Sequence, residues 1–173
     1  MQTSFIQFIT SINRKKNHIT MFLAGIFAGL IIIGLFMAVV LPRMLFTVSE
    51  SKYDFDKTVE VIAEQAQTSK WNMPHQYDLQ QTMAKHNFEV QPVKVFSLCK
   101  PDIAIRILGS DPDRHLSVLM PCRISVYQKA DGKTYISRMN AGLFARMIGG
   151  KASGAMHDAG DGIEVILKNI VKN

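Results

Sequence analysis

An uncharged run from Ile19 to Leu41 constrains this chain more than any other feature of its sequence. A helix needs about 20 consecutive apolar residues to cross the hydrocarbon core of a bilayer, and the run supplies them. A secretory signal peptide has a shorter apolar stretch, roughly 7–15 residues, that ends at a small-x-small cleavage site. The residues from Val39 to Arg43, which close the run, contain no clear site of this kind. We predict a permanent transmembrane helix over residues 19–42, with a cleaved signal as the alternative.

The basic residues around this run predict its orientation. Arg14, Lys15, Lys16 and the free amino terminus precede it, whereas only Arg43 and Lys52 follow closely. Because cytoplasmic flanks carry the excess of Lys and Arg, residues 1–18 are expected to be a cytoplasmic tail. Residues 43–173 then form an extracytoplasmic domain, which is periplasmic in a double-membrane bacterium.

Small residues inside the run predict a contact with a second helix. Gly25 and Gly29 form a G-x-x-x-G step, which lets another helix approach closely. The alternative is a chance pattern, because such spacings are common in apolar helices.

The charge of the chain does not indicate a nucleic-acid partner. The formal net charge is +6, but the 17 Lys and Arg that follow Leu41 face all 14 Asp and Glu, which leaves about +3 on the domain. No segment dense in Lys and Arg is interleaved with aromatic residues, so the electrostatic footprint of a nucleic-acid-binding protein is missing.

The pattern after residue 42 predicts one α+β domain, a small antiparallel sheet packed against helices. Asp54 is expected to cap a helix, Asp78 with Gln81 opens a short one, and Pro101 begins a third. Asp161 with Glu164 is read as the start of a last helix. Strands are predicted at residues 44–48, 71–77, 90–98, 116–120, 123–128 and 134–138, with a hairpin turn at Asp131-Gly132.

Cys99 and Cys122 are the only cysteines, and their role stays open at this point. In an exported domain an even pair is most simply a disulfide. Reduced thiols for redox or metal chemistry are the next reading, because Cys99 precedes a predicted helix N-terminus, where the dipole lowers a thiol pKa. Two inert, partly buried thiols are the third.

Methionine and histidine near proline supply further candidate ligands. Met73-Pro74-His75 and Met120-Pro121-Cys122 contain the residue types that a soft metal such as copper(I) prefers, so His75 and Met120 are candidate ligands. Methionines that fill gaps in the core are the alternative. The sequence names no particular metal or cofactor.

No motif in the domain indicates catalysis. The chain lacks a G-x-S-x-G elbow and a paired-carboxylate motif. An apolar stretch with Leu143, Phe144, Met147 and Ile148 beside Gly149-Gly150 is either a flap over the sheet edge or a lid or docking surface for a partner.

Three segments resemble a bacterial family, the domain-of-unknown-function family 302 (DUF302). They are residues 93–101 (VKVFSLCKP), 120–127 (MPCRISVY) and 131–140 (DGKTYISRMN), and the resemblance runs from about Ser51 to the C-terminus. It implies a small α+β domain that often dimerises, and it implies no activity. In the family the two cysteines tend to occur together, so Cys99 and Cys122 carry over as the pair with a structural or functional role; Lys100 stands where Asn is common.

These observations predict a single-pass protein of the bacterial inner (cytoplasmic) membrane with no enzymatic activity inferred. We expect a binding or accessory domain that works as a subunit of a larger membrane complex, with a protein partner or as a homodimer. The alternative is a thiol-dependent redox or sulfur-handling protein, or a haem or metal binder, centred on Cys99 and Cys122.

Overall fold

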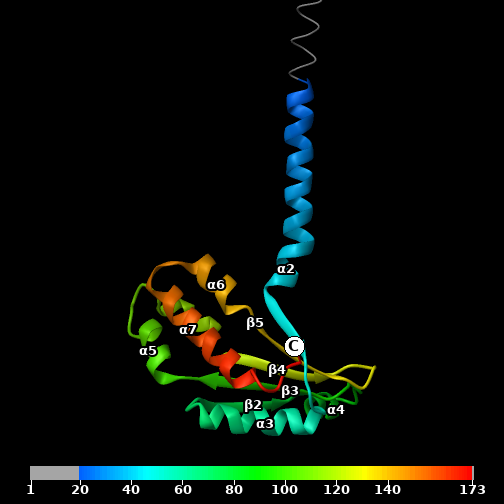
Figure 1. Cartoon of the computed structure of the whole chain (residues 1–173), viewed down its shortest axis with the longest axis vertical. Coiled ribbons are helices and arrows are strands. Elements are labelled where there is room, and N and C mark those ends of the chain that lie inside the picture. The colour runs from blue at the N-terminus through cyan, green and yellow to red at the C-terminus, as the bar shows by residue number, and fades with distance from the viewer. Residues whose placement is uncertain (1–19, 173) are drawn as a thin grey trace, which may run out of the picture. The chain divides into compact units, whose positions relative to one another are not determined.

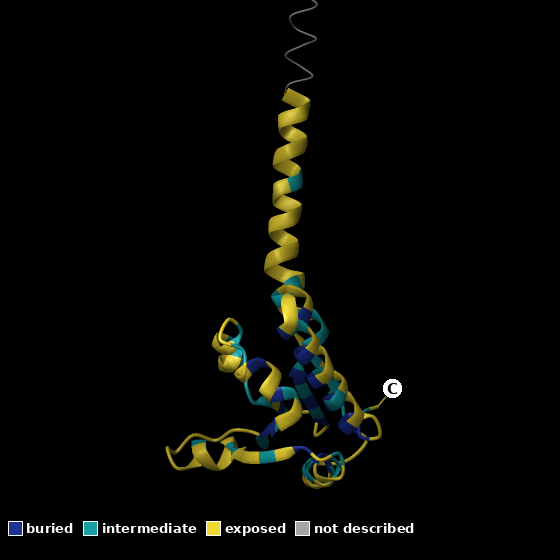
Figure 2. Cartoon of the chain, turned by 90° about the vertical axis from the view of Figure 1, so that its left-hand side faces the viewer, coloured by how far each residue is buried: buried dark blue, intermediate teal, exposed yellow. Residues whose placement is uncertain are grey.

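The computed structural model describes residues 20–172, and the predicted cytoplasmic tail lies outside them. The chain divides into two compact units, Met1–Arg43 and Met44–Asn173. The described part of the first unit belongs to one helix, Thr20–Met44, which is long and apolar enough to cross a membrane. Its last turns contain the π-helical segment η1 (Phe36–Val40) and α2 (Leu41–Met44). The helix is exposed almost throughout (Figure 2).

The second unit is built on a five-stranded antiparallel sheet with the order β1-β5-β4-β3-β2. The strands are β1 (Phe46–Glu50), β2 (Asn72–Asp78), β3 (Val93–Cys99), β4 (Cys122–Gln128) and β5 (Thr134–Met139). The predicted α+β fold class is therefore confirmed. The β4–β5 hairpin forms where Asp131-Gly132 predicted it, with Gly132 at a φ of 75° and the Lys133 amide donating to Asp131 Oδ1 at 2.9 Å.

Helices precede, connect and follow these strands: α3 (Phe55–Thr68), α4 (Leu79–Ala84), α5 (Pro101–Leu108), the 3-10 helix η2 (Arg114–Leu119), α6 (Ala141–Ile148) and α7 (Gly150–Leu167). The predicted caps hold: Asp54 accepts from the amide of Lys57, and Asp78 accepts from that of Gln81, each at 2.8 Å. Figure 1 shows α5, α6 and α7 gathered toward one end of the sheet, with the β4–β5 turn at the other.

Two predicted elements are wrong. Residues 116–120 form no strand, because the amide of Leu116 donates to the carbonyl of Asp113 and that of Met120 to Ser117, the short-range bonds of a 3-10 turn. The last helix begins at Gly150 rather than at Asp161. Asp161 and Glu164 are exposed positions within α7, so their spacing imitates a capping box without being one.

The two faces of the sheet differ in what covers them. On the inner face, α3 and α7 pack over the main core, which consists of Ile62, Ala66, Trp71, Phe96, Leu98, Ile124, Val126, Ile136, Ala159, Ile163, Ile166, Leu167 and Ile170. The strand register places the alternate residues on the opposite side, here called the outer face: Phe46, Val48, Glu50, His75, Tyr77, Val93, Val95, Ser97, Arg123, Ser125, Tyr127, Tyr135, Ser137 and Met139. In Figure 2 the buried residues concentrate on the sheet and on the side of α7 that faces it.

A second, smaller core joins the helices at one end of the sheet. Ile107 of α5, Ala145 of α6, and Ala152, Ala155 and Met156 of α7 are its buried members. Gly149 and Gly150 both adopt positive φ, at 67° and 61°, which allows α7 to begin directly after α6 and to pack against it. The second core therefore rests on small side chains.

Candidate functional site

The domain contains a pocket of about 570 Å³ beside the ends of β4 and β5. Its walls come from the residues that precede β4, from the β5–α6 junction and from α7, including Pro121, Asn140 and Gly160. The last register pair of these strands at this end is Ile124 with Arg138, and the chain diverges beyond it. Because the lining includes inner-face Arg138 and outer-face Ser137, the pocket reaches both sides of the sheet.

Small residues of α7 leave room for this pocket. Ala159 and Gly160 line it, and a Cβ added at Gly160 would lie 2.5 Å from the Cβ of Ala141 at the start of α6. The helix therefore approaches α6 as closely as a glycine permits. Asn140 fixes the junction between β5 and α6. Its side chain accepts from the amide of Leu143 at 3.1 Å and donates to the carbonyl of Met44 at 3.0 Å.

One wall of the pocket carries a bidentate ion pair. Arg138 of β5 donates from Nε to Glu164 Oε1 at 2.6 Å and from Nη2 to Oε2 at 2.7 Å. Its Nη1 donates to Ser49 Oγ at 3.0 Å. The side chain of Arg138 is only 7% exposed, whereas that of Glu164 is 54% exposed. The pair thus joins β5 to α7 and satisfies a buried guanidinium.

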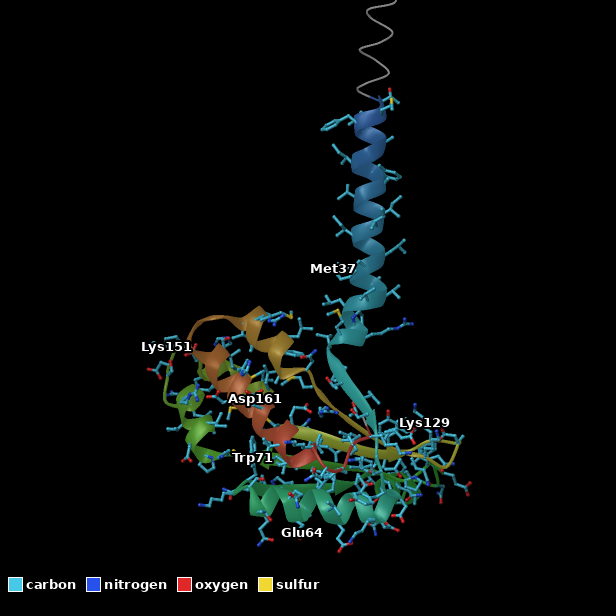
Figure 3. The ribbon with its side chains drawn as sticks, in the orientation of Figure 1. Met37, Glu64, Trp71, Lys129, Lys151 and Asp161 are labelled. Atoms are coloured by element: carbon cyan, nitrogen blue, oxygen red, sulfur yellow. The ribbon has the colours of Figure 1, made fainter. Side chains whose placement is uncertain are left out.

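The rim of the pocket on α7 is polar. His157 and Asp161, one turn apart, place Nδ1 and Oδ2 3.1 Å from each other, and both side chains are exposed. Figure 3 labels Asp161 on α7, and Lys151 near the N-terminal end of that helix. An exposed pair of this kind contributes little to stability, so its groups are available to solvent and to ligands.

Sulfur-containing side chains come together at the pocket. Met120, Cys122, Met139 and Met156 all line it, and they come from three separate segments of the chain. Met120 is joined to Pro121 by a cis peptide bond. The sequence pointed to Met120 and Cys122 as candidate ligands; it gave no signal for Met139 or Met156, because single methionines on a strand and a helix are typical of a core.

The structure separates the two cysteines by face. Both are free thiols, and the disulfide is not formed. Cys122 is the register partner of Leu98, so the side chain of Cys122 shares the inner face with Leu98. Cys99 follows Leu98 on β3, so its side chain points to the other side. Burial raises the pKa of the Cys122 thiol, and the nearby Cys99 raises it further. Cys122 is thus protonated at neutral pH, which works against a role as nucleophile.

The remaining predicted site residues lie elsewhere. His75 is on the outer face of β2, with its ring 5.9 Å from that of Tyr77, and it does not line the pocket that contains Met120. In residues 20–172 no group of three or more His, Cys, Asp or Glu is placed to hold a metal ion. Gly25 and Gly29 have open space around them within the chain, so the predicted helix packing stays a prediction.

The apolar residues of α6 are divided between inside and outside. Phe144 and Ile148 pack against the second core and Leu143 is half-buried, whereas Met147 is 62% exposed. They belong to a regular helix between Asn140 and Gly149. The prediction that this stretch is a lid or a docking surface stays a prediction.

The Arg138–Glu164 pair is the part of the site that sequence reasoning missed. A signal was present, because Thr134, Ile136 and Arg138 alternate on one side of a strand and the first two are buried. A charged residue in a buried row needs a partner, and the only open question was which acidic residue supplies it.

The comparisons agree with this fold. The family model described as "Domain of unknown function DUF302" matches residues 47–171. A crystal structure of an uncharacterized conserved DUF302 protein from Bacillus stearothermophilus is similar, with a TM-score of 0.65 and 18% identity over 73% of this chain and 98% of that one. No curated protein matches the chain. The chain therefore belongs to the DUF302 family.

Proposed function

We propose that this protein is a membrane-anchored, extracytoplasmic binding domain that acts as an accessory subunit. The observation that supports this best is the outer face of the sheet, which presents apolar and aromatic side chains to solvent. Phe46, Val48 and Tyr77 are 57%, 51% and 42% exposed. An exposed apolar surface of this type on a small domain marks a site of protein contact.

The composition of the outer face suits a protein partner. One row runs across all five strands through Val48, Ser137, Ser125, Val95 and Tyr77, with short serines between the larger side chains. In the next row Tyr127 and Tyr135 stack with ring centroids 5.8 Å apart, and Lys129 Nζ lies 3.8 Å from the Tyr135 centroid. Aromatic residues are enriched in protein interfaces, and serine hydroxyls offer hydrogen bonds there.

The anchor supports the accessory role. The apolar helix ends at Met44 and β1 begins at Phe46, so the outer face starts directly after the segment that we propose spans the membrane. A domain tethered in this way meets membrane partners at high effective concentration, so a modest interface is sufficient. A second copy of the chain and a different membrane protein are both partners of this kind.

Native mass measurement after gentle detergent extraction tests the proposal. We expect an assembly heavier than the monomer for the wild type, and a loss of the partner for Val48→Lys on the outer face. Val165→Lys is the matched control, because Val165 is 64% exposed on α7 and does not belong to the outer face. A wild-type monomer, or equal masses for all three proteins, would contradict the proposal.

Helix pairing through the anchor needs a separate variant. Gly29→Leu adds bulk where the structure shows no neighbouring atom within 4 Å, so the folded chain tolerates it. If Gly29→Leu alone dissociates the assembly, the G-x-x-x-G step is the contact, and the outer face is not.

The thiol-redox alternative receives less support from the geometry. A dithiol centre needs two sulfurs that can meet, and Cys99 and Cys122 point to opposite faces of the sheet. The raised pKa of Cys122 also lowers its thiolate fraction. Replacement of either cysteine by serine should therefore leave the assembly mass unchanged.

A further inference from the structure

We propose that α6 rests on the membrane in which the chain is anchored, where its basic side chains bind anionic lipid headgroups. The surface concerned, here called the α6 patch, consists of Met44, Arg146, Met147 and Lys151. This inference rests on the anchor of the proposed function, and it adds a lipid contact to the protein contact proposed for the outer face of the sheet.

Two hydrogen bonds join the start of α6 to the residues where the apolar helix ends. The side chain of Asn140 donates to the carbonyl of Met44 at 3.0 Å, and the backbone amide of Asn140 donates to the carbonyl of Leu45 at 2.9 Å. Met44 is the last residue of the proposed anchor, so it lies where the chain leaves the hydrocarbon core. An eight-residue helix is about 12 Å long, so all of α6 stays close to the bilayer surface.

The exposed side chains of the α6 patch combine apolar and basic groups. Met147 is 62% exposed and Met44 is 44% exposed, and Arg146 and Lys151 are exposed beside them in the chain. A surface that mixes apolar side chains with Lys and Arg is typical of segments that lie in the membrane interface. One short helix binds weakly by itself, but the anchor holds this one at high effective concentration beside the lipid.

The charge around the α6 patch has a single sign. Residues 139–157 contain Arg146 and Lys151 but no Asp or Glu, and residues 20–49 contain Arg43 but no Asp or Glu. In the described part of the chain, no ion pair involves any of these three basic residues. Their charges are therefore available to lipid phosphates, and no carboxylate in either segment repels an anionic surface.

A tryptophan on the α6 patch reports contact with lipid. Met147→Trp places the probe at an exposed position, and Val165→Trp is the matched control, because Val165 is 64% exposed on α7 outside the patch. The native Trp71 is 5% exposed, so it gives the same background in both variants. The full chain is reconstituted into vesicles of phosphatidylcholine with brominated acyl chains, either pure or with about 30% phosphatidylglycerol as the anionic lipid. Bromine quenches the fluorescence of a tryptophan that it contacts.

We expect stronger quenching of the Met147→Trp probe than of the Val165→Trp probe, and a further increase when phosphatidylglycerol is present. A basic residue near an anionic surface favours the bound state about five-fold, so Arg146→Gln with Lys151→Gln should lower the ratio of bound to free α6 roughly 25-fold. Lys85→Gln with Lys168→Gln removes the same charge at exposed positions outside the patch and should leave the quenching unchanged. Circular dichroism checks the fold of each variant.

Three outcomes would overturn the inference. Equal quenching of the two probes would mean that α6 does not lie on the membrane. Quenching of the Met147→Trp probe that is insensitive both to phosphatidylglycerol and to the two glutamines would mean proximity without headgroup binding. A chain that does not float with the vesicles would remove the anchor and this inference together. By contrast, a monomer in the native mass measurement would contradict the proposed protein contact and leave the lipid contact in place.

Discussion

The two halves of α7 perform different tasks, although they belong to one continuous helix. The buried residues of the C-terminal half are large and aliphatic: Ile163, Ile166 and Leu167, which pack on the sheet in the main core. Those of the N-terminal half are Ala152, Ala155 and Met156, which belong to the second core, and Ala159 follows near the middle of the helix. Large side chains fill the space against the sheet, and small ones let α7 pack closely on α5 and α6 in the second core.

This difference predicts which substitutions each half of α7 tolerates. A packed aliphatic wall resists change because each lost methylene removes contacts and creates a cavity. A wall of alanine and glycine has little to lose on truncation, but it is intolerant of added bulk where helices touch. The following substitutions should therefore affect the two halves unequally.

The largest effect is expected at the aliphatic half. Ile166 is 1% exposed, so Ile166→Ala should lower the free energy of unfolding by about 4 kcal/mol. In the other half, Ala155→Gly should cost only about 1 kcal/mol, chiefly from helix propensity. Denaturant unfolding of the extracted protein measures both. Similar losses at the two positions would remove the distinction between the halves.

Added bulk at the glycines of α7 should have the next largest effect on stability. A Cβ at Gly162 would lie 2.5 Å from Trp71 Cζ2, so Gly162→Ala should destabilise the domain by about 2 kcal/mol. At Gly154 the nearest atom is the flexible Arg106 Nη2 at 3.1 Å, and Gly154→Ala should be neutral or gain up to about 1 kcal/mol. A loss at Gly154 as large as that at Gly162 would mean that α7 packs tightly along its whole length.

Removing Glu164 should lower the stability of the domain more than removing its ion-pair partner Arg138. Glu164→Ala leaves a buried guanidinium whose remaining hydrogen bond goes to the Ser49 hydroxyl, which should cost about 2 kcal/mol. Arg138→Leu leaves a carboxylate that water can reach and should cost about 1 kcal/mol. Thermal unfolding of the two variants compares them, and the opposite order would show that Glu164 is the less solvated partner.

The smallest expected effect is a pH dependence from Cys122. Its pKa is raised above the ordinary 9.0, so the folded state keeps the proton that the unfolded state loses. The corresponding stability is present below pH 9 and is lost as the pH rises through the folded-state pKa, by about 1 kcal/mol or less. Cys122→Ala should flatten this alkaline decline, and an unchanged slope would assign it to another group.

The same comparison explains what the sequence could predict. The five strands of the sheet follow their residue pattern, and the hairpin and the caps of α3 and α4 follow local rules, so they were recognised; the strand expected at residues 116–120 was wrong. The aliphatic half of α7 was recognised from Ile163, Ile166 and Leu167, whose spacing is helical. The alanine and glycine half was missed because small residues give a weak periodic signal, and Asp161 with Glu164 resembled a helix start.

The site depended on information that local patterns do not contain. Met139 and Met156 are separated along the chain, and only the sheet order and the course of α7 bring them to one pocket with Met120 and Cys122. The alternation on β5 could have indicated a buried Arg138, but not that Glu164 is its partner. The cysteine pair was visible, yet its division between the two faces follows from a register that the sequence alone does not fix.

The central claim is that the α+β domain is held outside the cytoplasm by an uncleaved helix. A fusion of Asn173 to a reporter that is active only outside the cytoplasm, followed by membrane fractionation and intact mass, tests it most directly. We predict an active reporter in the membrane fraction on a chain of full length. A silent reporter would place the domain in the cytoplasm, and an active but soluble, shortened chain would show that the helix is a cleaved signal; either result would contradict the account.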